Sequence, residues 1–195
     1  MTKRLAGSTG QSLVEFAIML PLILVVALGV IEFGWALLDQ HVVTKLTREG
    51  SNLISRDSTI ERAMTALRSM STRPVNFDNG SKVIFSVIRK GSTANTPNFE
   101  QDILYQRYEY GSVPGGGPSR ITTSGQGSYR GAPDYEAINA DSDTRLQLTD
   151  MPSNLVVSPG GMVYVTEIYT THQLLTPLHQ FGITLPNRLY SIAYF

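Results

Sequence analysis

Cysteine is absent from this chain of 195 residues. Without a thiol the protein has no disulfide, no cysteine nucleophile and no thiolate ligand for a metal ion. Its folded part must therefore be stabilised by packing, and the redox compartment in which it works stays open.

An excess of charge of either sign is absent too. Lys and Arg together number 16, and so do Asp and Glu. This balance gives no indication of a basic stripe that would bind nucleic acid, so we expect no nucleic-acid partner.

Motifs for catalysis or for cofactor binding are also missing. The histidines, His41, His172 and His179, lack the i, i+4 spacing of a helical metal site, so structural or surface roles are expected for them. No Gly-x-Ser-x-Gly elbow occurs, and the glycines at 115–117 lie between prolines rather than after a strand. We therefore expect neither an enzyme nor a cofactor.

A long apolar segment near the N-terminus is what the chain does contain. From Phe16 to Leu38 the one strongly polar side chain is Glu32. A helix over this stretch, rising about 1.5 Å per residue, can cross a hydrocarbon layer roughly 30 Å thick. Pro21 within it predicts a bend or a weakened helix. Glu32 lies near the aqueous end, which predicts an interfacial carboxylate reached by water.

The residues before this segment resemble a short leader. Lys3 and Arg4 precede Gly10, which ends a run of small and hydroxylated residues. Such a basic leader is cut before the apolar segment, whereas an ordinary secretory signal is cut after it. The two cations also favour a cytoplasmic N-terminus. Glu15, at the start of the apolar segment, is costly there, which indicates a function.

Beyond the membrane segment the pattern remains helical. An apolar stripe recurs at three- and four-residue steps and predicts that the helix continues with one packed face: Val42, Val43, Leu46, Gly50, Leu53 and Ile54. Ser58 and Glu61 have capping-box spacing, which predicts a second helix from Ser58 to about Met70. Arg73-Pro74 would end it.

The rest of the chain is typical of a small sheet. Residues 82–89, 103–110, 162–171 and 189–195 are rich in β-branched and aromatic side chains. They predict an α+β fold in which the amphipathic helix packs on an antiparallel sheet of about four strands. The long Gly-rich loop 111–159 between the second and third strands is expected to be surface decoration rather than a binding loop, with a short helical turn within 135–148.

Residues 10–21, followed by 31–34 and 47–51, resemble the TadE-like pseudopilins of the tight-adherence (Tad, Flp) branch of type IV pilus machinery. The C-terminal tail resembles the family more loosely, and the central loop shows no resemblance. The resemblance implies cleavage by a membrane aspartyl prepilin peptidase between Gly10 and Gln11. Glu15 would then be neutralised by the N-terminal ammonium of a neighbouring subunit, with Phe16 beside it in the assembly. N-methylation of Gln11 stays open, because many type IV pilins have an aromatic residue there.

The expected organisation follows from these features. Residues 1–10 form a cleavable leader, 11–38 a transmembrane, pilin-like helix, 39–73 an amphipathic helical region, and 74–195 an extracytoplasmic β-rich domain. The implied protein is a minor pseudopilin of the bacterial inner membrane that acts in Tad pilus assembly and adhesion. Its implied partners are prepilin peptidase, other pilins and pseudopilins, the Tad membrane platform and the lipid bilayer.

Two other classes of protein stay open. A membrane-anchored extracytoplasmic binding module would keep its N-terminus and use the Gly-rich loop and aromatic strands to hold a glycan or a protein. A secreted protein would be cut after Gly29, although the apolar residues that continue to Leu38 argue against this.

Overall fold

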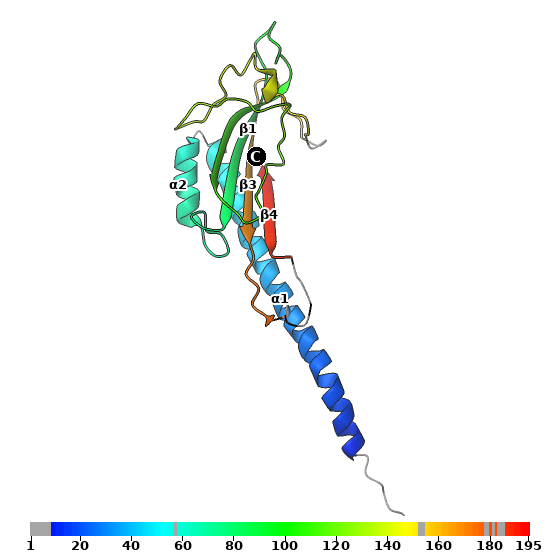
Figure 1. The fold of residues 1–195 in the computed structure, drawn as a ribbon. Helices are drawn as coiled ribbons and strands as arrows, with labels where there is room; N and C mark the ends of the chain where they lie inside the picture. The colour runs from blue at the N-terminus through cyan, green and yellow to red at the C-terminus, as the bar shows by residue number, and fades with distance from the viewer. Residues whose placement is uncertain (1–8, 57, 152–154, 178–179, 181, 183–185) are drawn as a thin grey trace, which may run out of the picture. The chain divides into compact units, whose positions relative to one another are not determined.

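The computed structural model describes residues 9–56, 58–151, 155–177, 180, 182 and 186–195. Along these described residues two helices are followed by four strands, with a short 3-10 turn between the second and third strands (Figure 1). The chain divides into two compact units. The first comprises Met1–Leu38 and Gln173–Asn187, and the second comprises Asp39–His172 and Arg188–Phe195.

Helix α1 extends from Thr9 to Ser55 and continues through Pro21. Among the described residues it is the one helix long and apolar enough to cross a membrane, and its most apolar window has no buried residue. The predicted continuation beyond Leu38 is confirmed. Helix α2 spans Ile60–Met70.

The cap of α2 lies one residue later than predicted. Thr59 is the N-cap, and its hydroxyl accepts a hydrogen bond from the backbone N–H of Arg62. The capping box of Ser58 and Glu61 is therefore wrong. Both Ser58 and Thr59 carry a hydroxyl that can cap a helix, and the sequence does not distinguish them.

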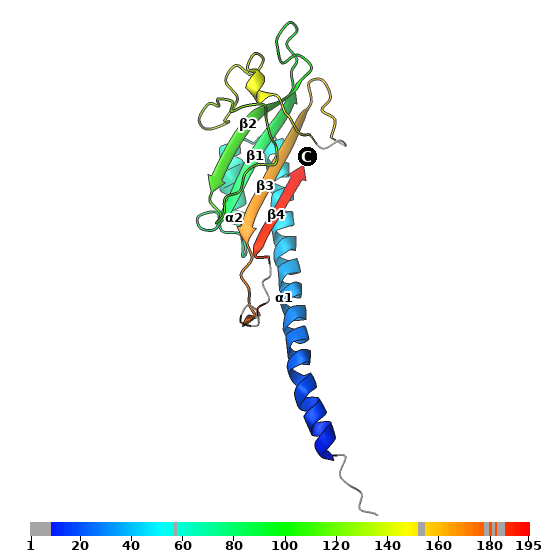
Figure 2. The ribbon, with the colours of Figure 1, turned by 45° about the vertical axis from the view of Figure 1, so that its right-hand side comes forward.

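The sheet is antiparallel, with the order β2-β1-β3-β4 (Figure 2). Its strands are β1 (Ser81–Lys90), β2 (Asp102–Gly111), β3 (Met162–Thr171) and β4 (Arg188–Tyr194). They are rich in β-branched and aromatic residues, which suit a pleated surface, and β1 is buried along both of its faces. The predicted α+β class and the number of strands are confirmed.

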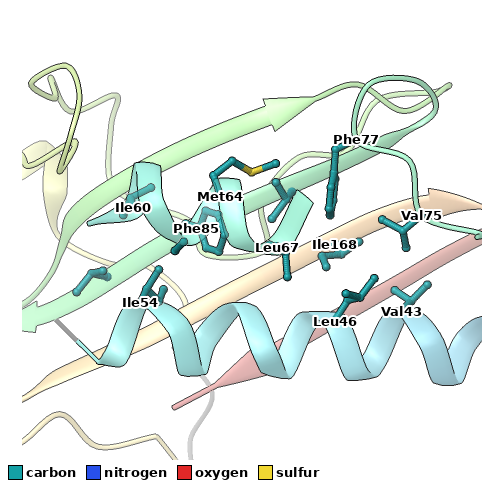
Figure 3. Close-up of a cluster of buried hydrophobic side chains, with 13 residues drawn as sticks. Val43, Leu46, Ile54, Ile60, Met64, Leu67, Val75, Phe77, Phe85 and Ile168 are labelled. Atoms are coloured by element: carbon teal, nitrogen blue, oxygen red, sulfur yellow. The ribbon is translucent and has the colours of Figure 1, made fainter. Parts of the chain in front are cut away.

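The C-terminal part of α1 and helix α2 cover one face of the sheet, as Figure 3 shows. Leu46 and Ile54 of α1, with Leu67 of α2, pack on Phe85 and Ile168 of the strands. The predicted packing of the stripe is thus confirmed.

The close approach of α1 to the sheet depends on Gly50. A Cβ atom at this position would lie 2.7 Å from Cγ2 of Thr166, too near for any side chain unless the neighbours shift.

The described residues of the long segment 112–161 cover the other face of the sheet. Ile121, Leu146 and Val157 are almost fully buried there, and Leu146 belongs to the 3-10 turn Thr144–Leu146. The expected helical turn is confirmed. The expectation of surface decoration is wrong, because these apolar side chains complete the core on this side.

Candidate functional site

The predicted processing and assembly residues share the first two turns of α1. The described part of α1 begins at Thr9, so the bond between Gly10 and Gln11 lies in its first described turn. Nothing lies within 4 Å of the position a Cβ of Gly10 would take, and both Glu15 and Phe16 are exposed. The structure thus brings the four residues together on an accessible helix end.

Glu15 has a neutral partner in its own chain. Gln11 Nε2 donates a hydrogen bond of 2.9 Å to Glu15 Oε1, as the i, i+4 spacing on a helix allows. An amide partner orients the carboxylate without cancelling its charge. Because the side chain is exposed, a cation from another molecule can reach it.

The apolar residues that follow Glu15 are left uncovered by the described part of the chain. Large side chains on all sides of α1 are exposed, among them Ile18, Leu22, Leu24, Val26 and Val30. So large an exposed apolar surface on a folded protein marks a contact with lipid or with another protein. This part of α1 is therefore suited to a bilayer or to packing against other helices.

Glu32 does not behave as the sequence predicts. Its side chain is 1% exposed, and its carboxylate accepts hydrogen bonds from the backbone N–H groups of Leu175 and Thr176, at 3.1 and 2.8 Å. The hydroxyl of Thr176 donates a further bond of 2.6 Å. The expected interfacial carboxylate reached by water is wrong, because a segment distant in sequence covers it. No local signal in the sequence identifies that partner.

A second buried polar pair lies in the other unit. His172 Nδ1 is 2.7 Å from Asp39 Oδ2, and both side chains are almost fully buried. His41 is exposed, and His179 lies outside the described residues. Within the described ranges, no three His, Cys, Asp or Glu side chains lie close enough together to hold a metal ion.

Glu167 fixes the long segment to the sheet. Its buried carboxylate accepts hydrogen bonds from the Ser119 hydroxyl, the Arg120 backbone N–H and the Tyr190 hydroxyl. Burial, followed by the charge of Glu167, raises the pKa of Tyr190. The Arg120 guanidinium lies 4.6 Å from the centre of the Tyr190 ring, a cation–π contact. These groups bind one another, so the cluster serves to hold the fold.

Together these features define an α+β protein in which the one membrane-length helix among the described residues fits a single-pass membrane protein. The family model described as TadE-like protein matches residues 10–52. The chain is thus TadE-like over this part of α1, consistent with a TadE-like protein of the Tad pilus system. No curated protein and no solved structure matches the chain.

Proposed function

We propose that this protein is a minor pseudopilin that is processed by prepilin peptidase and takes part in Tad pilus assembly and adhesion. The observation that carries the proposal is Glu15, an exposed carboxylate at the start of an uncovered apolar helix within the TadE-like region. Such a carboxylate is unfavourable in lipid unless another molecule neutralises it.

Cleavage between Gly10 and Gln11 is compatible with the local structure. Nothing lies within 4 Å of the position a Cβ of Gly10 would take, so the bond is open to the approach of another molecule. The absent side chain of Gly10 lets an extended backbone enter a narrow peptidase cleft. Processing would remove residues 1–10 and create an ammonium group on Gln11.

The new ammonium explains how subunits associate. Within lipid, an isolated carboxylate in the apolar segment costs roughly 2.5 kcal/mol or more on insertion scales. The ammonium of a neighbouring subunit would cancel that charge and leave Phe16 and the apolar side chains beyond it to pack against a second helix. In this role Glu15 selects other processed pilins as partners.

The remaining parts of the proposal concern location and partners. The N-terminus would face the cytoplasm, residues 11–38 would cross the inner membrane, and the domain that begins at Asp39 would lie outside. Prepilin peptidase, other pilins and pseudopilins, and the Tad membrane platform would be the partners. In this proposal the protein acts by assembly and not as an enzyme.

The test is Glu15→Gln in the full chain. The variant keeps the size of the side chain and one acceptor oxygen, and it removes the charge. We expect membrane insertion and cleavage to be retained, while recovery of pilin partners after cross-linking and the number of surface pili fall sharply. Glu61→Gln, which changes an exposed carboxylate on α2, is the matched control and should leave both readouts unchanged.

Equal partner recovery and normal piliation in Glu15→Gln would contradict the proposal. Glu15 would then be an incidental charge, and a membrane-anchored extracytoplasmic binding module would be the better assignment.

A further inference from the structure

The segment between β3 and β4 has an unusual composition for a loop in water. From Gln173 to Asn187 the sequence has no Asp, Glu, Lys or Arg, and it contains leucine, isoleucine, phenylalanine and proline. The same residues belong to the compact unit formed with Met1–Leu38, the unit that holds the apolar part of α1. Loops that face water are usually polar, so this composition indicates surroundings that are less polar than water.

The position of Glu32 along α1 indicates how deep in a bilayer its carboxylate would lie. Glu32 lies about 25 Å further along the helix axis than Glu15, at a rise of about 1.5 Å per residue. If Glu15 marks the inner boundary of a hydrocarbon layer roughly 30 Å thick, Glu32 lies inside that layer, near its outer boundary. A tilt of the helix moves Glu32 further inside.

The groups that bind Glu32 must lie at the same depth. The N–H of Leu175 and the N–H and hydroxyl of Thr176 are within 3.1 Å of its carboxylate oxygens. The side chain of Leu175 is nevertheless 48% exposed. An apolar side chain is thus held beside a membrane-length helix with much of its surface free.

The hydrogen bonds to Glu32 explain how the non-helical backbone of this loop can lie at membrane depth. Non-helical backbone at membrane depth requires acceptors for its N–H groups, because lipid offers none. Glu32 supplies acceptors for two consecutive N–H groups and one hydroxyl. The carboxylate and the loop therefore satisfy each other, and apolar side chains are left to face outward.

We infer that residues 173–177 insert into the outer part of the lipid bilayer, held there by Glu32, with Leu175 in contact with acyl chains. The protein would then hold the membrane by two segments, α1 and this loop. The inference depends on α1 crossing a bilayer and not on the pilus role, since a simple anchored protein would show it equally.

The absence of cysteine makes a direct test straightforward. The full-length Leu175→Cys variant contains one cysteine, which is spin-labelled. The labelled protein is placed in nanodiscs of phosphatidylethanolamine and phosphatidylglycerol. The measurement compares relaxation by oxygen, which concentrates in lipid, with relaxation by a water-soluble nickel chelate. Leu24→Cys on α1 and Val156→Cys on the domain surface serve as lipid and water references, because both side chains are exposed.

The expected ratio of oxygen to nickel accessibility at position 175 is close to that at position 24 and severalfold above that at position 156. A ratio like that at 156 would overturn the inference, because water would then cover the loop. Low accessibility to both reagents would also overturn it, because protein would then cover Leu175.

A second test uses the spin label at position 175 to ask whether Glu32 holds the loop in place. Glu32→Leu removes the acceptors, so the loop should leave the lipid and the nickel accessibility at position 175 should rise severalfold. Glu61→Leu is the control and should change nothing. An unchanged label in Glu32→Leu would show that Glu32 does not hold the loop.

Discussion

Helix α1 has two parts that are similarly helical and differ in what covers them. Beyond Asp39 its apolar side chains are buried, with Val43 and Leu46 at 0% and 6% exposure. Before Leu38 most of the large apolar side chains are exposed, and Leu24 is 53% exposed. Apolar content alone therefore does not predict a core position. The first part requires lipid or other helices, whereas the second part is completed by the protein's own sheet.

Polar groups on the two parts differ in the same sense. In the second part the Thr47 hydroxyl donates to the Val43 carbonyl, and the Ser51 hydroxyl donates to the Ala193 carbonyl of β4. Near the start of the first part, Glu15 has the amide of Gln11 as its partner. Glu32, further along the first part, is buried and bound by Leu175 and Thr176, so the contrast concerns the two ends of α1. Internal partners near one end and an exposed charge near the other are what a subunit with a folded domain and an assembly helix would need.

The largest expected effect of a single change is at His172. Replacement by alanine leaves the buried Asp39 carboxylate without this partner, and breaking a buried pair in this way typically costs about 3 to 5 kcal/mol. We expect His172→Ala to lower the free energy of unfolding by that order, measured by denaturant titration followed by circular dichroism. His41→Ala, on the exposed side of α1, is the control and should be nearly neutral. Equal midpoints for the two variants would contradict a stabilising role for the pair.

A matched pair of leucines compares the two parts of α1 directly. Leu46→Ala leaves a cavity against the sheet and should cost about 2 to 5 kcal/mol. Leu24→Ala removes the same atoms from an exposed position and should change the stability of the domain by less than about 0.5 kcal/mol. Thermal unfolding in detergent measures both. A midpoint unmoved by Leu46→Ala would show that this face of α1 is solvated or reserved for another subunit.

Replacing two glycines of α1 by alanine should give a smaller difference in stability between the two parts of the helix. Gly50→Ala would place a methyl group 2.7 Å from Cγ2 of Thr166, and such overpacking costs about 1 to 3 kcal/mol. Gly34→Ala meets nothing within 4 Å and replaces glycine by a better helix former, so it should be neutral or stabilising by up to about 1 kcal/mol. Denaturant midpoints of the two variants check the contrast. A Gly50→Ala variant as stable as Gly34→Ala would mean that the helix and the sheet adjust freely.

The sheet and the stripe on α1 were predictable because each leaves a local signal. The strand runs are rich in β-branched and aromatic residues, and their predicted ends lie close to those of β1 to β4. The stripe around Leu46 repeats at helical spacing, so its burial follows from amphipathicity. The segment Gly10 to Phe16 was likewise visible as a motif. These features need no knowledge of distant contacts.

The features that could not be predicted depend on long-range pairing. Glu32 finds its partners at Leu175 and Thr176, and Asp39 finds His172, far along the chain in each case. Such partners leave no period in the sequence. The segment 112–161 also lacks a period, because its buried residues, such as Ile121, occur singly between turns. Its cover of the sheet is set by the final packing rather than by local preference.

The most direct test of the pseudopilin assignment is N-terminal sequencing of the mature protein, isolated from membranes of cells that assemble the pilus. We predict that the mature chain begins at Gln11, and that in Gly10→Val the full-length form accumulates in the membrane. A mature N-terminus at Met1 or Thr2 would indicate a simple anchor, and one at Val30 a secreted protein. Either result, or shortening of Gly10→Val at the wild-type rate, would contradict processing after Gly10.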